Sequence, residues 1–457
     1  MEGNDFITKK ITFNKAGKWI ININVDSNGI YTITTKEKRT SKNMLLPILT
    51  FSTNKSETSN VFELFPKLEE YDASINAVGI DFGTSECCAF VIRKHGPDGV
   101  VLDPITKLRT LSTYTTIDCK RLCGQIVFDR IEYNVQQTAF NIKRLLGKNV
   151  EEIVMDPLWS FNIINYYNQI ALFGGSVGKN TYYSSSVEIC STVLCDIKSK
   201  IDEYQGCLLE DVVITIPSCY DERQKDATVD AAEIAEWKHV NLLSEPIAAA
   251  FAYSYEKEFP KNSMILLFDC GGGTTDICIG KVHNEKLQIL CENGDFFIGG
   301  NDFDKILIDY FYEILKEKYN FDALNSTKKY RLMRKCREIK HFLSAHETDK
   351  LDVDDFIFDH DDVIPITRRI FEDLSDTLIV KAKNLIAETL AKTKVNYSDI
   401  QIVYQVGGGC RVPMIKRMLL EIFPNAIHEC SVNPEWMVAK GAALYSYFLK
   451  TKNKIGK

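Results

Sequence analysis

Two short segments of the sequence each bring a carboxylate, glycine and hydroxyl side chains together directly after an apolar run. They are "VGIDFGTSECCAFVI" at 78–92 and "LLFDCGGGTTDICIG" at 266–280. Both read as an apolar strand, an aspartate at its end, a turn with glycine and hydroxyl groups, and a second apolar strand. Because the aspartates, Asp81 and Asp269, lie in different halves of the 457-residue chain, the repeat suggests two similar lobes that face each other.

The residue types in these turns suit a polyphosphate bound with magnesium. Glycine lets backbone N–H groups approach phosphate oxygens and adopts the positive φ that aims amides inward, and Gly271, Gly272 and Gly273 stand together. Mg²⁺ prefers oxygen ligands and keeps most of its waters, so Asp81 and Asp269 would bracket one ion. The hydroxyl groups that could donate to phosphate or position a water are those of Thr84, Ser85, Thr274 and Thr275. For each segment taken alone, a plain hairpin turn is the alternative.

Two more glycine loops lie in the half of the chain that carries Asp269. "VGGGCRVP" at 406–413 follows the apolar run "IQIVYQV" and opens the segment "PMIKRMLLEIF", with Pro413 suited to the first turn of a helix. "FIGGND" at 297–302 has the same arrangement. A strand, a glycine loop and a helix N-terminus in that order make an anion or nucleotide site.

Two other segments resemble known sites but lack essential residues. In "GGSVGKNT" at 174–181 only three residues separate Gly174 from Gly178, where a Walker loop has four, and Asn180 replaces its serine or threonine. We interpret this segment as an ordinary turn. The acidic stretch "DKLDVDDFIFDHDD" at 349–362 lacks the glycine and the final glutamate of a calcium loop, and it predicts a solvated hairpin.

From Ile75 onward, short apolar runs typical of strands alternate with longer segments of helical periodicity. This alternation indicates an α/β fold whose strands and helices position these residues. Apolar runs predict strands at 77–82, 211–216, 264–269 and 400–406. Helical spacing of apolar residues predicts helices at 184–204, where Ser185 and Glu188 form a capping box, and at 301–315. The first 75 residues differ: β-branched runs around "DSNG" at 26–29 predict a hairpin in a small β-rich N-terminal extension.

Composition narrows the classes of function. An apolar fraction of 45%, a charged fraction of 26% and a net charge of -7 are those of a soluble globular protein. They predict no general attraction to nucleic acid or to a membrane. The 14 cysteines include no C-x-x-C pair, and the N-terminus lacks a secretory signal, so we expect free thiols in a reducing compartment rather than zinc or disulfides.

Taken in order, seven segments resemble the nucleotide-binding domain of the 70-kilodalton heat-shock chaperone family (heat shock protein 70). They are "GIDFGTS", "VVITIPSCYDERQKDATVDAAEIA", "LLSEPIAAAFAYSYE", "LLFDCGGGTTDICI", "IGGNDFD", "VGGGCRVP" and "NPEWMVAKGAALYS". The resemblance covers residues from about 76 to 450. It implies the actin-like ATPase fold, in which two ribonuclease-H-like lobes close on Mg-ATP. The implied division is the extension at 1–75, lobe I at 76–262 and lobe II at 263–457.

The resemblance also implies roles for individual residues. Lys143, in "TAFNIKRLLGK", would lie beside the γ-phosphate, Glu245 would help to position water, and Asp276 would lie near that water. Asp81 and Asp269 would be the magnesium-side carboxylates. The residues implied to bind ATP are Gly83, Thr84, Ser85, Gly271, Gly272, Gly273, Thr274, Gly299, Gly300, Lys340, Gly407, Gly408, Gly409 and Arg411, with Thr274 also among the catalytic groups. The simpler alternatives are a surface lysine at 143 and a helix-start carboxylate at 245.

The chain departs from the family pattern around the expected adenosine pocket. Arg337 replaces a glutamate, His341 replaces an arginine that stacks on adenine, Glu435 replaces an aspartate, and Cys410 replaces a small hydroxyl residue. Histidine can still stack on adenine, with less charge. The selectivity for the base is therefore left open, while the phosphate-binding residues match.

The implied function is ATP binding with slow, Mg-dependent hydrolysis, acting in folding or stress response. The expected partners are ATP or ADP, Mg²⁺, co-chaperones, nucleotide-exchange factors and client proteins, in the cytoplasm or also the nucleus. The alternatives are a non-hydrolysing, nucleotide-gated interaction protein and, less favoured, a small-molecule kinase of the same superfold. Because the sequence ends after "GAALYSYFLKTKNKIGK", we expect a truncated member without the linker and the peptide-binding domain.

Overall fold

The computed structural model describes residues 19–25, 31–37, 60–64, 67–118, 120–166, 169–177 and 180–455. The chain divides into two units, Met1–Ser59 and Asn60–Lys457. In the first unit, β1 (Trp19–Val25) pairs antiparallel with β2 (Tyr31–Glu37), which confirms the predicted hairpin. Its predicted turn at 26–29 lies outside the described residues.

The second unit contains a first mixed sheet of six strands in the order β14-β13-β4-β5-β6, with β7 beside β5. β14, β13 and β4 run parallel, whereas β4, β5 and β6 are antiparallel to their neighbours. The strands are β4 (Val78–Asp81), β5 (Glu86–Arg93), β6 (Gly96–Gly99), β7 (Thr110–Ser112), β13 (Asp211–Ile216) and β14 (His239–Ser244). The predicted strands at 77–82 and 211–216 are therefore confirmed as β4 and β13.

A second mixed sheet of six strands repeats this plan in the order β21-β20-β15-β16-β17-β3. β21, β20 and β15 run parallel, and β15, β16, β17 and β3 are antiparallel. The strands are β3 (Val61–Glu63), β15 (Met264–Cys270), β16 (Thr275–His283), β17 (Lys286–Asp295), β20 (Ile402–Val406) and β21 (Ile427–Cys430). The predicted strands at 264–269 and 400–406 are confirmed. Each sheet thus carries one of the two repeated strand–turn–strand segments as a hairpin.

Helices cover both sheets. The predicted helix at 184–204 is α2 (Ser186–Gln205), capped by Ser185 and Glu188 as expected, and the one at 301–315 lies within α5 (Gly300–Tyr319). Besides α4 and α10, described below, the other α-helices in the described ranges are α1 (Gln125–Asp129), α3 (Glu222–Ile234), α6 (Lys329–Ala345), α7 (Arg368–Leu374), α8 (Asp376–Thr393) and α9 (Pro413–Ile422). No helix in the described ranges is both long and apolar enough to cross a bilayer.

Shorter strands form three small sheets. β18 (Thr348–Asp352) pairs with β19 (Val363–Thr367), so the acidic stretch at 349–362 supplies the first strand and the connection of a hairpin, but Leu351, Val353 and Phe356 within it are buried and not solvated. The remaining strands are β8 (Thr115–Thr116), β9 (Thr138–Ala139), β10 (Asn162–Tyr166), β11 (Gln169–Val177) and β12 (Asn180–Ser185). The Walker-like segment 174–181 spans the end of β11 and the start of β12, with residues 178 and 179 outside the described part.

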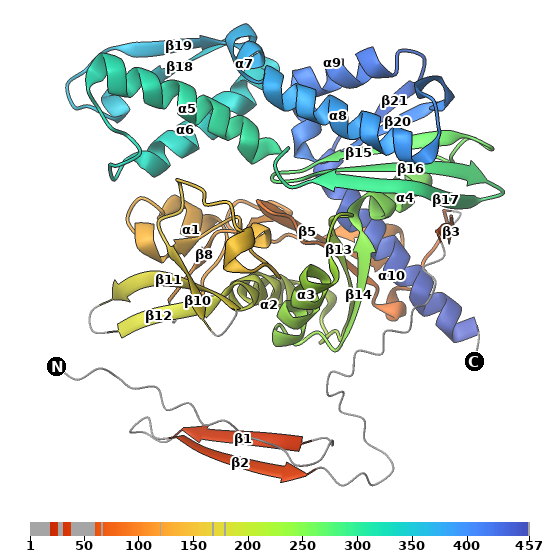
Figure 1. Cartoon of the computed structure of the whole chain (residues 1–457). Helices are drawn as coiled ribbons and strands as arrows, with labels where there is room; N and C mark the ends of the chain where they lie inside the picture. The colour runs from red at the N-terminus through yellow and green to blue at the C-terminus, as the bar shows by residue number, and fades with distance from the viewer. Residues whose placement is uncertain are drawn as a thin grey trace. The chain divides into compact units, whose positions relative to one another are not determined.

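Two helices cross between the sheets and join them. α4 (Glu245–Glu256) packs on β15 and β16 of the second sheet, and α10 (Met437–Ile455) packs on β4, β5 and β13 of the first. The crossing is close because Gly441 has no side chain: a Cβ there would lie 1.6 Å from the carbonyl oxygen of Ala248. Figure 1 shows α4 and α10 between the second sheet with α5 to α9 above and the first sheet with α2 and α3 below.

Candidate functional site

The two repeated turns face each other across one cleft. Its volume of about 580 Å³ lies within the range of about 300–1,000 Å³ that is usual for small-molecule sites. Most of the predicted site residues line it, from the turns after strands of both sheets and from the start of α4. They are Asp81, Gly83, Thr84, Ser85, Lys143, Glu245, Asp269, Gly271, Gly272, Thr274, Gly300, Lys340, Gly407, Gly408, Gly409 and Arg411.

A buried ion pair stands at the base of the cleft. Lys143, in the 3₁₀ turn Ile142–Arg144, places its Nζ 2.7 Å from Oε1 of Glu245, the first residue of α4. The same Nζ donates to the carbonyl oxygen of Phe82 in the first turn. The two residues are only 5% and 6% exposed, so a surface lysine is excluded. Burial alone would lower the pKa of Lys143, but the carboxylates of Glu245 and Asp81 outweigh this and raise it.

Three aspartates surround this pair. Burial raises the pKa of Asp81 to about 7, with Glu245 as the next cause, and burial with Glu245 does the same for Asp276. Burial also raises the pKa of Asp269, and the neighbouring carboxylates add to this rise. Four carboxylates therefore share one ammonium group in a desolvated space, an arrangement that favours either protonation or a bound cation.

The donor set fits a magnesium ion held partly through water. Asp81 is the last residue of β4 and Asp269 the last but one of β15, the two central strands that enter the turns. Oδ2 of Asp276 is buried and accepts no hydrogen bond from any described residue. Within the described ranges, no three His, Cys, Asp or Glu side chains are grouped so that they alone could hold a metal. Mg²⁺ would then complete its shell with waters and phosphate oxygens, as it usually does.

The glycines of the second turn allow close contact with the first turn. A Cβ on Gly272 would lie 2.3 Å from Oγ of Ser85, and one on Gly273 would lie 2.6 Å from Cγ2 of Thr84. The expected positive φ at Gly271, Gly272 and Gly273 is wrong, because none of the three has it. The physical reason for glycine here is therefore the approach of the opposite turn. The N–H groups of Gly272 and Gly273 donate to no atom within the described part of the chain, and that of Gly272, which lines the cleft, is free for a ligand.

The two other glycine loops support these turns. Gly407, after β20, has a φ of 80°, and a Cβ there would lie 2.3 Å from the carbonyl oxygen of Cys270. α5 starts at Gly300, and the N–H groups of Gly300 and Asn301 donate to the carbonyls of Gly271 and Gly272 at 3.0 and 2.7 Å. The N-terminus of α5 thereby holds the second turn in place. α9 starts at Pro413, as predicted.

The expected adenosine side of the cleft is rich in charge. Lys340 places Nζ 2.9 Å from the Gly300 carbonyl and 2.8 Å from Asp304. Arg411 pairs with Glu435 at 2.9 Å. Burial, with Lys340 and Arg337 nearby, lowers the pKa of His341, so its imidazole is neutral at pH 7. Positive charge on this wall therefore comes from Lys340, Arg337 and Arg411 and not from the histidine.

Three predicted site residues do not line the cleft but lie behind it. Gly273 lies beneath the side chain of Thr84, and Gly299 lies against Gly272 and Gly273. Asp276, on β16, accepts a hydrogen bond of 2.7 Å from the N–H of Ser218 and a second from its hydroxyl. These residues can shape the turns or orient water, and they do not face the main cavity.

Sequence reasoning missed several residues that hold the site together. Glu86 in β5 meets Arg337 in α6 at 2.5 Å across the cleft. Arg144 donates to the Gly273 carbonyl and pairs with Asp302, both at 3.1 Å. Two features of the sequence could have pointed to these residues. Arg144 directly follows Lys143, and Arg337 departs from the family pattern.

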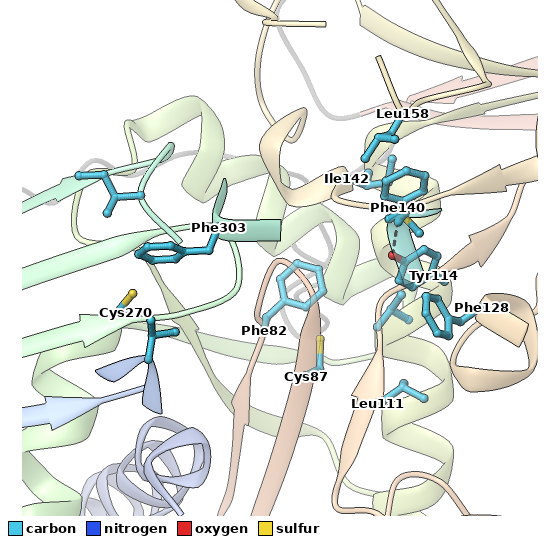
Figure 2. Close-up of a cluster of buried hydrophobic side chains, with 14 of the residues drawn as sticks. Phe82, Cys87, Leu111, Tyr114, Phe128, Phe140, Ile142, Leu158, Cys270 and Phe303 are labelled. Carbon is cyan, nitrogen blue, oxygen red and sulfur yellow. Dashed lines mark hydrogen bonds between the residues drawn. The ribbon is translucent and has the colours of Figure 1, made fainter. Parts of the chain in front are cut away.

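Aromatic side chains fix the first turn from behind. Figure 2 shows Phe82 and Cys87 between Phe303 with Cys270 on one side and Tyr114 with its aromatic neighbours on the other. All of the labelled side chains are buried, and the ring of Tyr114 packs on that of Phe140 at 5.1 Å. The back of the turn is thus packed in the core while Thr84 and Ser85 line the cleft.

Comparison with known proteins gives one family. The family model described as Hsp70 protein matches residues 77–456. The chain is 29% identical over 377 residues to a heat shock 70 kDa protein of Emericella nidulans, covering 82% of this chain and 58% of the relative. It is 29% identical over 383 residues to heat shock cognate 70 kDa protein 3 of Dictyostelium discoideum, covering 82% and 60%. For heat shock 70 kDa protein BIP3 of Oryza sativa subsp. japonica it is 29% over 376 residues, covering 80% and 56%. The chain thus spans less than two thirds of the length of these curated relatives.

Proposed function

The chain belongs to the Hsp70 protein family, and from this premise we propose that it binds Mg-ATP in the cleft and hydrolyses it slowly. The observation that carries the proposal is the group of four carboxylates around Lys143 where the two turns meet. The family implies the actin-like ATPase fold, and two mixed sheets of the same plan joined by crossing helices are consistent with its two lobes, divided as 76–262 and 263–457.

The proposed roles follow from position. Asp81 and Asp269 would hold Mg²⁺ through water, and the ion would neutralise charge on the phosphates. The free N–H group of Gly272, with the hydroxyls of Thr84 and Thr274, would bind phosphate oxygens. Phosphoryl transfer to water needs mainly positioning and charge stabilisation. The ammonium group of Lys143 would stabilise charge developing on the γ-phosphate.

Two carboxylates would orient the attacking water. Glu245 lines the cleft beside Lys143. Asp276 lies one layer behind, fixed by Ser218 with one oxygen unpartnered. A carboxylate that is fixed through one oxygen and free on the other can accept a hydrogen bond from water in a set direction. The adenosine would lie against Lys340, His341 and the loop Gly407–Gly409.

In the cell, the proposed role is in protein folding or stress response, through co-chaperones, exchange factors or clients, in the cytoplasm or nucleus. This rests on family membership alone. The match covers about 58% of the length of the first relative. We therefore propose that client proteins are bound by partners of this chain.

The test is single-turnover hydrolysis of Mg-ATP, together with binding of ATP, ADP and GTP. We expect binding of ATP and ADP, and a fall in hydrolysis of at least about 100-fold in Lys143→Ala and Thr274→Ala, as for removal of a group that stabilises transition-state charge. Lys350→Ala, in an exposed ion pair far from the cleft, is the matched control and should behave as the unchanged protein.

One observation favours a second candidate, a nucleotide-gated protein that does not hydrolyse ATP. Lys143 uses two of its three N–H donors on Glu245 and the Phe82 carbonyl, so the protein holds this ammonium group in place and one donor is left for a phosphate. Tight ATP binding without any turnover would establish this candidate and exclude the ATPase. Phosphorylated product on added hydroxylated metabolites would instead indicate a kinase.

A further inference from the structure

A second cavity, of about 100 Å³, lies beside the cleft. One wall comes from the loops around α1 and before β10, and the other comes from α5, α6 and the loop before α5. Lys143 and the glycines of the second turn line only the cleft. Four residues line both spaces: Ser85, Asn301, Asp304 and Arg337. The cavity is therefore a separate space that adjoins the proposed nucleotide site.

The interior of this cavity is largely aromatic. The ring of Tyr114 packs on that of Phe128 at 4.8 Å and on that of Phe140 at 5.1 Å, between ring centroids, and Figure 2 shows the three rings together. Trp159 and Met333 also line the space, and all five side chains are buried. Because an apolar cavity of about 150 Å³ can bind benzene, a space of about 100 Å³ between aromatic faces is of the right order for one small ring.

Three hydrogen-bond donors on this lining lack a good acceptor. Nε1 of Trp159 and Nε of Arg144 are buried and have no partner among the described residues. The hydroxyl of Tyr114 donates to the thioether sulfur of Met333 at 4.0 Å, and a thioether is a weak acceptor. Trp159 is only 8% exposed, and an indole N–H that is buried so deeply usually has a partner. Since an unsatisfied buried donor costs free energy, a ligand that brings an acceptor oxygen is favoured here.

The charge around the cavity favours an anion. Cationic side chains outnumber carboxylates in its lining, with Arg144, Lys148, Lys305, Arg334 and Arg337 against Asp156, Asp302 and Asp304. Arg144 uses Nη2 on the Gly273 carbonyl and on Asp302, which leaves its Nε for another acceptor. Burial lowers the pKa of Lys148, and an anion beside this lysine would offset that effect.

An apolar rim leads into the cavity from solvent. Val154, Met155 and Phe297 line it and are 65%, 58% and 41% exposed. Together with the buried aromatic interior, this rim suits the entry of a small amphipathic molecule, whose apolar part leaves water while its polar group reaches the donors.

We propose that this cavity binds a small aromatic carboxylate, with its ring beside Tyr114, Phe128 and Phe140 and its carboxylate at Trp159 and Arg144. The ligand contacts both walls and lies next to the turn that carries Lys143, without entering the cleft. The site does not depend on the proposed nucleotide binding. The opposing interpretation is a packing gap between the two walls that binds no such ligand.

Fluorine NMR titration of the full chain with para-fluorobenzoate, without nucleotide, tests this site. We expect saturable binding with a Kd of about 0.1–1 mM, which the binding energy per atom of small ligands allows. The probe para-fluorotoluene has the same ring but no carboxylate, and we expect it to bind at least about tenfold more weakly, because it leaves the donors unsatisfied. Absence of saturable para-fluorobenzoate binding, or equal affinity for the two probes, would overturn the proposal.

A matched pair of tryptophan variants locates the bound probe. Trp159→Phe keeps an aromatic ring but removes the indole N–H, and it should weaken para-fluorobenzoate by about tenfold. Trp237 also has a buried Nε1 without a partner in the described part of the chain, but it does not line the cavity. Trp237→Phe should therefore leave the affinity unchanged.

A third variant changes charge at a half-buried position. Lys148→Met removes the ammonium group but keeps most of the side chain, and it should weaken para-fluorobenzoate by about threefold, as for the loss of a partly exposed ion pair. Affinities in Trp159→Phe and Lys148→Met that both equal that of Trp237→Phe would place the probe elsewhere and overturn the site.

Discussion

The two repeated turns have the same plan but opposite surfaces. The first turn carries side chains: Phe82 is buried behind it, and Thr84 and Ser85 face the cleft. The second presents bare backbone, and its glycines receive the side chains of the first. The repeat is therefore complementary, with projections on one lobe and hollows on the other. A shared fold plan does not make the two halves interchangeable.

The supports of the two turns differ in the same way. Side chains hold the carbonyls of the first turn: Lys143 binds Phe82, and the hydroxyl of Thr113 binds Thr84 at 2.6 Å. In the second turn, the carbonyls of Gly271 and Gly272 accept from backbone N–H groups of α5, and only that of Gly273 accepts from a side chain, Arg144. Truncating side chains should therefore damage the first turn, while adding a side chain should damage the second.

The largest effect is expected from breaking the buried pair that supports the first turn. Lys143→Met leaves Glu245 buried without its partner, which costs about 3–5 kcal/mol in the free energy of unfolding. The double variant Lys143→Met/Glu245→Leu should recover more than half of this loss. Urea unfolding measures both. Lys225→Met, in an exposed pair with Glu222, is the control and should cost less than about 0.5 kcal/mol.

The next largest effect is expected from filling the hollow of the second turn. Gly272→Ala places a Cβ 2.3 Å from Oγ of Ser85 and should cost about 1–3 kcal/mol of stability, as overpacking does. Ser85→Gly in the same chain should restore most of the loss, since it removes the opposing side chain. Gly408→Ala has open space around its Cβ and should leave the free energy of unfolding unchanged. Equal losses in Gly272→Ala and Gly408→Ala would contradict the fitted contact.

The fold could be predicted from the sequence more fully than the contact that Gly272→Ala tests. Strands β4, β13, β15 and β20 and helices α2 and α5 follow from local apolar periodicity, and the structure has all of them. Asp81 and Asp269 could be recognised from the sequence because each is a carboxylate that directly follows an apolar run predicted to be a strand. The reason for the glycines was missed, because contact between Gly272 and Ser85 depends on how two distant segments meet. The roles of the site residues stay predictions.

The parts that could not be predicted depend on long-range packing. Nothing local shows that Lys143 pairs with Glu245, or that Glu86 meets Arg337. Residues 60–64 were assigned to the N-terminal extension, yet β3 lies in the second sheet. A three-residue strand carries too little periodicity to be recognised, and its place at a sheet edge depends on an exposed partner strand.

The charge between the turns predicts a pH dependence. Asp81 and Asp276 have pKa values raised to about 7 without a ligand, so between about pH 4 and 7 the folded state holds protons that the unfolded state has lost. The stability that they contribute is therefore complete below about pH 4 and is lost as pH rises through about 7. A cation must displace these protons, so affinity for Mg-ATP should rise up to tenfold per pH unit from 6 to 7 for each proton released.

Calorimetry in buffers of different ionisation enthalpy counts those protons directly. The Asp276→Asn variant lacks one titrating group and should release fewer protons at pH 6.5. An unchanged proton count in this variant, with binding intact, would assign the release to the other carboxylates. Binding of Mg-ATP with no pH dependence at all would contradict a cation site between the two turns.

The smallest effect is expected at the side-chain support of the first turn. Thr113→Val keeps the shape of the residue but removes the hydroxyl that donates to the Thr84 carbonyl, which should cost about 1 kcal/mol, the net worth of a neutral hydrogen bond. The comparison variant is Thr275→Val. The hydroxyl of Thr275 donates to the Ile298 carbonyl at 2.6 Å and to no carbonyl of the second turn. Its loss should therefore cost a similar amount of stability but leave the affinity for ADP unchanged. Thr113→Val should weaken ADP as well, since the first turn presents its ligand groups through side chains that this hydroxyl holds in place. Equal effects of the two variants on ADP affinity would show that both turns are positioned in the same way, and the contrast between them would then be one of shape alone.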